Sequence, residues 1–420
     1  MSILLKNATY IHNETLEITV GDILVDGEKT LLTADNHTEN QATEILDCSG
    51  MIVTKSFAIG HHHAYSALAR GMPAPAVTPS NFYEILKNIW WRLDKALDKD
   101  TLEASALATA MASAKAGSTF VIDHHSSPFC IDGSLEILAN AFHRVGINHL
   151  LCYEISDRDG MDKAEKGLAE TEAYLQKHQG LVGLHASFTV GDNTLKKAAD
   201  LMFKYNSGIH IHVAEDIADR QITKRNYNYN FIIDRLDSFG ILNSSKTILA
   251  HCIHLDNNER KTISESQAWV VQNTESNLNN NVGFFNSKGL THKIMLGTDG
   301  MHSDMLRSAQ ASYFAGKHFD NVDFAGIYRR FNNVHTYIKE NGFSGDDDNN
   351  LVVLDYDTPT PVNRDNFLAH FIFGINSSHV KHVISNGKLI VKNRNIISVD
   401  EKEILKFTRQ QAKRLWQKLI

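Results

Sequence analysis

Short apolar and β-branched runs recur through the middle of the chain, and a stretch with helix-compatible spacing follows each of them. Strands that alternate with helices in this way indicate a parallel sheet. Eight units of this kind predict a closed (β/α)8 barrel of the TIM type rather than an open doubly wound sheet. No G-x-G-x-x-G or Walker motif follows any of the runs, which also disfavours the open sheet. The eight runs are Met51–Val53, Phe120–Asp123, His149–Tyr153, Val182–His185, Ile209–Val213, Thr247–His251, Trp269–Gln272 and Ile294–Thr298.

The two ends of the chain show a different pattern, in which short strands are joined by tight turns. Asp26-Gly27 indicates a turn between N-terminal strands, and Asn386-Gly387 between two apolar runs is a strong hairpin signal. The predicted terminal strands are Ile18–Val20, Ile23–Val25, Glu44–Leu46, Leu351–Leu354, His382–Ser385 and Lys388–Val391.

These patterns predict two domains. Residues 51–349 form the barrel, and residues 1–50 together with 350–420 form a small discontinuous β-sandwich domain. Helical spacing and many charges predict a surface helix from Glu401 to Ile420. The polar patch Asp346–Asn350 is expected to be a solvated loop.

The composition limits the possible partners of the protein and its cellular compartment. The net charge of −7 disfavours a nucleic-acid partner. No apolar run reaches the roughly 18 residues that would cross a bilayer, and the N-terminus turns polar too early for a signal peptide. Four scattered cysteines without a C-x-x-C pair favour free thiols in a reducing compartment. We therefore expect a cytoplasmic protein without a membrane partner, and a homodimer or higher homo-oligomer.

Histidines are grouped at the ends of the predicted barrel strands, which is the face on which barrel enzymes carry their active sites. The chain has 22 histidines, and His61-His62-His63 is the densest group. In an extended segment residues i and i+2 point the same way, so His61 and His63 can face the barrel axis together while His62 points away. Such a pair can clamp a metal ion, and the alternative is a chance run or a loop cluster.

A second group follows the five-residue run Ile209–Val213. His210 and His212 share a face of this strand, and His212 lies nearer the mouth of the barrel. We interpret His210 as a buried structural residue and His212 as a ligand. Glu215 lies just beyond the strand, where its carboxylate can reach a water molecule on the metal.

Two further strand ends complete the predicted site. His251 ends a strand and suits an acid/base or oxyanion role, whereas Cys252 beside it is more simply a small core residue than a nucleophile. Asp299, between Thr298 and Gly300, can ligate a metal and also accept a proton. His61, His63, His212 and Asp299 then form a set of three nitrogens and one oxygen, which suits Zn²⁺ and also Fe²⁺ or Mn²⁺.

The order and context of these motifs resemble the amidohydrolase superfamily, in its chlorohydrolase/aminohydrolase branch of deaminases. The resemblance runs over the whole chain, and finer details are similar to the SsnA group of aminohydrolases. The residues that carry it are His61-His62-His63, Ala69-Arg70-Gly71, Val121–Ser126, Leu184-His185-Ala186, His210–Glu215, Leu249–Cys252, Ser276-Asn277-Leu278, Gly297–Met301 and Asn386-Gly387-Lys388. Two departures are Lys55-Ser56, where the family has Pro-Gly, and the Asp346–Asn350 patch in place of a glycine-rich approach to the last strand.

The resemblance implies one divalent metal ion, most simply Zn²⁺. Binuclear relatives carry a carboxylated lysine at the end of the fourth strand, where this chain has His185. By the same resemblance His185, Arg70 and His125 are candidate substrate contacts.

The expected reaction is hydrolysis of a non-peptide carbon–nitrogen bond in a small heterocycle by a metal-bound hydroxide. Asp299 would accept the proton of the water, Glu215 would act as general acid, and His251 would steady the water or the oxyanion. The favoured form is deamination of an aminated purine-, pterin- or pyrimidine-like ring. Two alternatives stay open: a ring-opening cyclic amidohydrolase that acts on an intermediate of the purine-degradation type, and a non-catalytic metal-binding relative.

Overall fold

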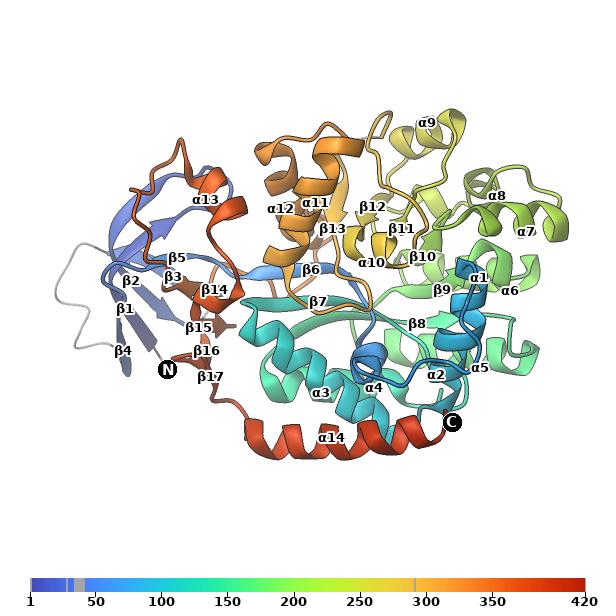
Figure 1. Ribbon diagram of the computed structural model, residues 1–420, viewed down its shortest axis with the longest axis horizontal. Helices are drawn as coiled ribbons and strands as arrows, with labels where there is room; N and C mark the ends of the chain where they lie inside the picture. The colour runs from blue at the N-terminus through green and yellow to red at the C-terminus, as the bar shows by residue number, and fades with distance from the viewer. Residues whose placement is uncertain (1, 28, 34–41, 291, 420) are drawn as a thin grey trace.

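The computed structural model describes residues 2–27, 29–33, 42–290 and 292–419, and it divides into a barrel and a smaller sheet (Figure 1). The barrel holds the middle of the chain, whereas both ends of the chain meet in the smaller sheet. This arrangement confirms the predicted fold class.

Eight parallel strands, hydrogen-bonded in sequence order, form the barrel. The ring closes where the backbone N–H groups of Thr298 and Asp299 donate to the carbonyl of His61, at 3.0 and 3.1 Å. This closure places the segment after the last strand directly beside the end of the first. The strands are β6 (Phe57–His62), β7 (Ser118–His125), β8 (Asn148–Ile155), β9 (Val182–Ala186), β10 (Ile209–Val213), β11 (Ile248–His251), β12 (Trp269–Gln272) and β13 (Ile294–Leu296).

The first barrel strand was placed wrongly by the sequence pattern. The predicted run Met51–Val53 overlaps β5 (Ile52–Lys55), which pairs with β1 (Ser2–Ile11) and β14 (Leu351–Leu354) in the smaller sheet. The chain passes between the sheets at Ser56, whose N–H donates to Asn350 O at 3.0 Å. Both β5 and β6 are apolar and mostly buried, so hydrophobic periodicity could not tell which sheet each of them joins.

The smaller sheet has nine strands among the described residues, in the order β17-β16-β15-β14-β5-β1-β2-β3, with β4 paired to β1. The predicted hairpin at Asn386-Gly387 is confirmed, because it joins β15 to β16 and both residues have positive φ, 48° and 70°. The two predicted strands around residues 18–25 form one strand. The bounds are β1 (Ser2–Ile11), β2 (Ile18–Asp26), β3 (Lys29–Thr33), β4 (Glu44–Asp47), β14 (Leu351–Leu354), β15 (Val380–Ser385), β16 (Lys388–Lys392) and β17 (Asn395–Ile396).

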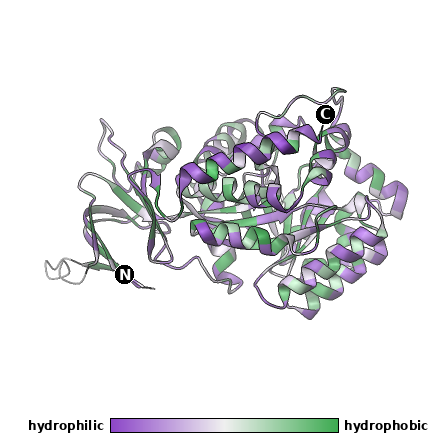
Figure 2. Ribbon diagram, turned by 90° about the horizontal axis from the view of Figure 1, so that it is seen from below, coloured by the Kyte–Doolittle hydropathy of each residue, from purple (hydrophilic) through white to green (hydrophobic). Residues whose placement is uncertain are grey.

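Helices surround the barrel. Figure 2 shows hydrophilic residues, in purple, on the outer turns of many of these helices. The predicted C-terminal helix is confirmed as α14 (Glu401–Gln417), and it lies along α3 of the barrel, where Arg414 pairs with Asp100 at 2.8 Å (Figure 1). No helix of the described chain is long and apolar enough to cross a membrane. The other helices are α1 (Phe82–Ile85), α2 (Trp91–Ala96), α3 (Lys99–Lys115), α4 (Ser134–Val145), α5 (Met161–Leu175), α6 (Asp192–Lys204), α7 (Ile217–Tyr227), α8 (Ile232–Ser238), α9 (Asn257–Glu265), α10 (Thr274–Asn279), α11 (Met305–Phe319), α12 (Phe324–Glu340) and α13 (Phe367–Phe373).

The Asp346–Asn350 patch is not the fully solvated loop that its composition suggested. Asp347 and Asp348 are exposed, but Asn349 and Asn350 are buried. The side chain of Asp346 is 4% exposed and pairs with His335 Nδ1 at 2.7 Å and with Lys55 Nζ at 3.5 Å. The sequence did not indicate this burial, because Lys55, Gly27 and Asn386, which pair with Asp346, Asn349 and Asn350, lie far away along the chain.

Candidate active site

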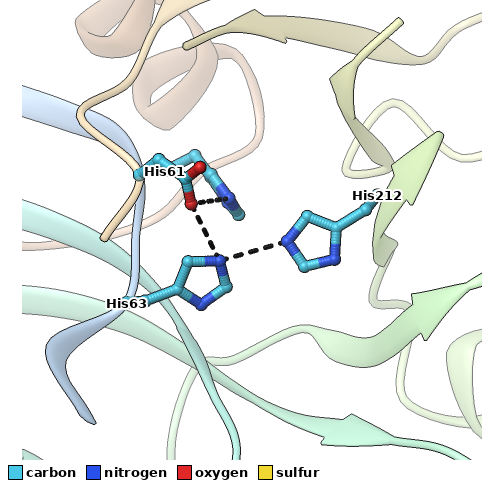
Figure 3. Close-up of side chains that lie close together, drawn as sticks. His61, His63 and His212 are labelled. Atoms are coloured by element: carbon cyan, nitrogen blue, oxygen red, sulfur yellow. Dashed lines mark hydrogen bonds and ion pairs between the residues drawn. The ribbon is translucent and has the colours of Figure 1, made fainter. Parts of the chain in front are cut away.

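Four predicted metal ligands meet at the C-terminal end of the barrel strands. His61 and His63 come from the end of β6, His212 from β10, and Asp299 from the turn after β13. His63 Nε2 lies 3.0 Å from Asp299 Oδ1 and 3.1 Å from His212 Nε2, and His61 Nε2 lies 3.4 Å from Asp299 Oδ1. Figure 3 shows the three imidazoles directed toward a common point.

Each of these imidazoles is held through its other ring nitrogen. His61 Nδ1 is 2.8 Å from His210 Nε2, His63 Nδ1 is 2.6 Å from the carbonyl of His124, and His212 Nδ1 is 2.7 Å from the carbonyl of His185. Metal-binding histidines are oriented by such outer partners. All three Nε2 atoms are thereby left to face one another.

The donor set fits a divalent metal ion. The atoms that His61, His63, His212 and Asp299 offer all lie within 4.8 Å of one another, and three nitrogens with one carboxylate oxygen are a common zinc set. His61 Nε2 is buried and has no hydrogen-bond partner among the described residues. Burial alone would raise the pKa of Asp299, but hydrogen bonds from His61 and His63 hold it well below its ordinary range.

A second possible group combines His63 and His212 with His124 and Glu154. It cannot be filled together with the first, because each shared imidazole has one lone pair at Nε2. Glu154 is also already paired with Arg158 Nη1 at 2.8 Å. The geometry therefore favours a single metal held by the set that contains Asp299.

Glu215 and His251 stand beside this set. Glu215 Oε2 lies 3.5 Å from His251 Nε2, which is 4.0 Å from Asp299 Oδ2. Burial and the nearby Asp299 carboxylate raise the pKa of Glu215 well above its ordinary range, which favours the protonated form of this carboxyl group. Burial lowers the pKa of His251 to about 4, and Asn277 fixes its Nδ1 at 2.7 Å. A neutral imidazole therefore presents Nε2 to the site.

Left-handed backbone turns aim these side chains inward. Ala214, His251 and Asp299 have φ of 46°, 73° and 50°, which non-glycine residues rarely adopt. The turn before Glu215 is held because Ala214 N–H donates to Asp219 Oδ2 at 2.9 Å. Such strained positions concentrate at functional sites, where the surrounding structure maintains them.

A cavity of about 610 Å³, its open mouth included, is lined by three of the four donors, His63, His212 and Asp299. Of the predicted substrate contacts, His185 lines it. His125 is fully buried and bonds to Ser127 at 2.9 Å, and Arg70 is exposed, with its guanidinium on the carbonyl of Met301 at 3.2 Å. The structure does not bring these two side chains to the cavity, because a motif match fixes their position in the sequence but not the direction in which they point.

Several cavity residues were missed from the sequence. Glu154 ends β8, and its place at the C-terminal end of a barrel strand could have identified it. Arg158, four residues later, carried no such signal. Most of the aromatic residues that line the cavity come from the segment α1–α2, which contains a π-helical turn at Leu86–Trp90. π-helical turns often mark functional sites, but no pattern in the sequence predicted this one.

Three residues next to the ligands in the sequence or in space have structural roles. Cys252 is fully buried and burial raises the pKa of its thiol well above the ordinary range, in keeping with a core residue. His62 points away from the other imidazoles, and its Nδ1 bonds to the carbonyl of Asp299 at 2.6 Å. His210 is buried, as expected, and the sequence had not indicated that it orients His61.

Comparisons with known proteins agree with this fold. The family model of the amidohydrolase family matches residues 58–328. The 5'-deoxyadenosine deaminase of Methanopyrus kandleri is 28% identical over 382 residues, covering 84% of each chain. An adenosine deaminase of Xanthomonas campestris, solved with bound zinc, has a TM-score of 0.80 at 18% identity over 98% of each chain. Atrazine chlorohydrolase TrzN of Arthrobacter aurescens, solved with zinc, has a TM-score of 0.82 at 16% identity, over 98% of this chain and 100% of that one.

The barrel, the donor set and the family match together define a metal-dependent hydrolase. The chain belongs to the amidohydrolase family, and it is a hydrolase that acts on carbon–nitrogen bonds.

Proposed function

We propose that this protein hydrolytically deaminates a small aminated heterocycle of the purine, pterin or pyrimidine kind, with one zinc ion held by His61, His63, His212 and Asp299. The observation that carries the proposal is that this donor set lies beside Glu215 and His251, and that all of these residues except His61 line one cavity. The relatives that are named as deaminases of adenosine-type compounds support the choice of ring and reaction.

The chain's own residues would divide the chemistry as follows. When bound, a divalent metal supplies a Lewis acid that activates water near neutral pH. Asp299, whose pKa is held low, is ionised and can accept a proton from the attacking water. Glu215, whose pKa is raised, can deliver a proton to a ring nitrogen or to the leaving amine. His251, fixed by Asn277, can hold the water or the developing oxyanion through Nε2.

The test is a substrate panel of aminated purines, their nucleosides, pterins and pyrimidines, assayed with purified zinc-loaded protein. Ammonia is measured by a coupled assay, and ring absorbance is followed in parallel. Release of one ammonia per ring, with the ring system retained, is the expected result.

Other outcomes of the same panel would overturn the proposal. Loss of ring absorbance without ammonia would indicate ring opening by the same site. Failure to turn over any member, with metal fully bound, would favour a metal-binding relative without activity.

A further inference from the structure

A buried ion cluster forms part of the cavity wall beside Trp91. The guanidinium of Arg158 lies 2.8 Å from Glu154 Oε1, 3.2 Å from Asp159 Oδ2 and 3.0 Å from Ser126 Oγ. It also pairs with the carboxylate of Asp94, and its charge lies 5.3 Å from the Trp91 ring centre. Arg158 is therefore saturated by protein acceptors and has little capacity left for a ligand.

The cavity consequently offers no free cation to an anionic substituent. Among the described residues that line it, Arg158 is the one lysine or arginine, whereas Glu154 and Asp299 contribute two carboxylates with lowered pKa and Glu215 a carboxyl group with raised pKa. A bound divalent metal would balance the charge at the Asp299 end, but not near Glu154. A phosphate or carboxylate on the substrate would thus lose its hydration and meet a negative wall, which is costly at low dielectric.

Glu154 keeps one oxygen for a ligand. Its Oε2 lies 3.3 Å from His124 Nδ1, but His124 Nε2 approaches the carbonyls of Leu184 and His210 at 3.1 Å each. Whichever ring nitrogen of His124 carries the proton, a carboxylate oxygen has two lone pairs, so Oε2 can still accept a hydrogen bond from a ligand. Burial alone would raise the pKa of Glu154, but His185, Arg158 and a hydrogen bond from His124 hold it well below its ordinary range. An acceptor with a spare lone pair thus lies in the cavity wall.

We propose that Glu154 determines substrate specificity: its Oε2 accepts a hydrogen bond from an N–H or O–H group of the substrate, and the cavity selects uncharged or cationic rings over rings that carry phosphate or carboxylate. The inference rests on the proposed function, because it concerns the same cavity, but it makes a separate claim about charge.

Matched pairs test the claim: adenosine with its 5'-phosphate, guanosine with its 5'-phosphate, and cytidine with its 5'-phosphate. Binding to the zinc-loaded protein is measured by calorimetry, so the result does not depend on turnover. For a pair that binds, the uncharged member should bind at least roughly 10-fold more tightly, the scale of one hydrogen bond to a charged group. Equal or tighter binding of the phosphate, or no binding by any uncharged member, overturns the inference. Binding with this preference but no ammonia release would leave the inference standing and reject the proposed function.

Substitutions separate recognition from a structural role. Glu154→Gln keeps the shape of the side chain but removes the charge, so Arg158 becomes able to attract an anion. The preference for the uncharged member should fall roughly 10-fold or more, with metal content unchanged. Asp159→Asn is the matched control, because Asp159 also pairs with Arg158 but does not line the cavity. It should leave the preference near the wild-type value. If Glu154→Gln weakened both members of a pair alike, Glu154 would have only a structural role.

Discussion

His61 and His210, which face each other across the barrel from β6 and β10, are joined by a hydrogen bond of 2.8 Å between Nδ1 and Nε2. Both rings are fully buried. The Nδ1 atoms of the other two histidine ligands, His63 and His212, are hydrogen-bonded to backbone carbonyls. His61 is therefore the ligand whose orientation depends on a second side chain. His210 Nδ1 in turn lies 3.7 Å from Cys152 Sγ. A side chain that is not a ligand therefore controls the direction in which a ligand points.

The first prediction concerns this contact. His210→Phe keeps a ring of similar shape but removes the partner of His61 Nδ1, so metal affinity should fall by roughly 10- to 100-fold. The measurement is competition for zinc with a calibrated chelator. His149→Phe is the control, because His149 stacks on Phe142 near the start of β8 and touches no ligand. Equal affinities in the two variants would show that His210 does not orient the site.

The second prediction separates proton transfer from metal binding. Glu215→Gln retains size and polarity but cannot carry a proton, so kcat should fall by roughly 10²- to 10⁴-fold while bound zinc is unchanged. Asp299→Asn should lower both kcat and bound zinc, because Asp299 is one of the four donors. Steady-state kinetics and elemental analysis on the same preparations check both. Near-normal turnover of Glu215→Gln would transfer the acid role to another group, with His251 the next candidate.

The third prediction concerns stability away from the active site. Lys55 Nζ donates to the carbonyls of Asp346 and Asp347 at 2.8 and 3.1 Å, and the buried Asp346 carboxylate also pairs with His335. Asp346→Asn should lower the free energy of unfolding by about 3 kcal/mol, the lower end for a buried pair, since Lys55 keeps both carbonyls. Urea denaturation at neutral pH measures the loss, and bound zinc should not change.

The same substitution has a pH signature. Burial alone would raise the pKa of Asp346, but His335 and Lys55 lower it below the ordinary value of 3.8. A lowered pKa contributes stability above the unfolded pKa, and this contribution disappears as pH falls through the folded pKa. The difference between wild type and Asp346→Asn should therefore be full at neutral pH and shrink below about pH 4. A difference that stays constant across this range would mean that the charge of Asp346 does not matter.

Much of the site could be predicted from one periodicity and one property of the fold. The two-residue repeat of a strand placed His61 and His63 on one side and His62 on the other, and the active-site face of a barrel gathered the ends of distant strands. The grouping of histidines did not indicate Glu154, because no histidine lies at the C-terminal end of β8. Its neighbour Arg158 lies in a loop, where no periodicity fixes the direction of a side chain.

Long-range pairing set the limit of the sequence reasoning. Lys55 and Asp346, the sites of two departures from the family pattern, contact each other, although 291 positions separate them. Neither residue alone indicates a buried pair, and so the patch was expected to be solvated. The strand before Ser56 was assigned to the barrel for a related reason: its partners in the smaller sheet come from both ends of the chain.

The central claim is that His61, His63, His212 and Asp299 hold one divalent metal ion. Elemental analysis of purified wild type, His61→Ala, His212→Ala and His185→Asn tests it most directly. His185 is the matched control, because its backbone carbonyl, not its ring, holds His212. About one equivalent of zinc should be present in wild type and in His185→Asn, and both alanine variants should lose most of it. Near-stoichiometric metal in both alanine variants, or none in wild type after loading with zinc, would contradict the account.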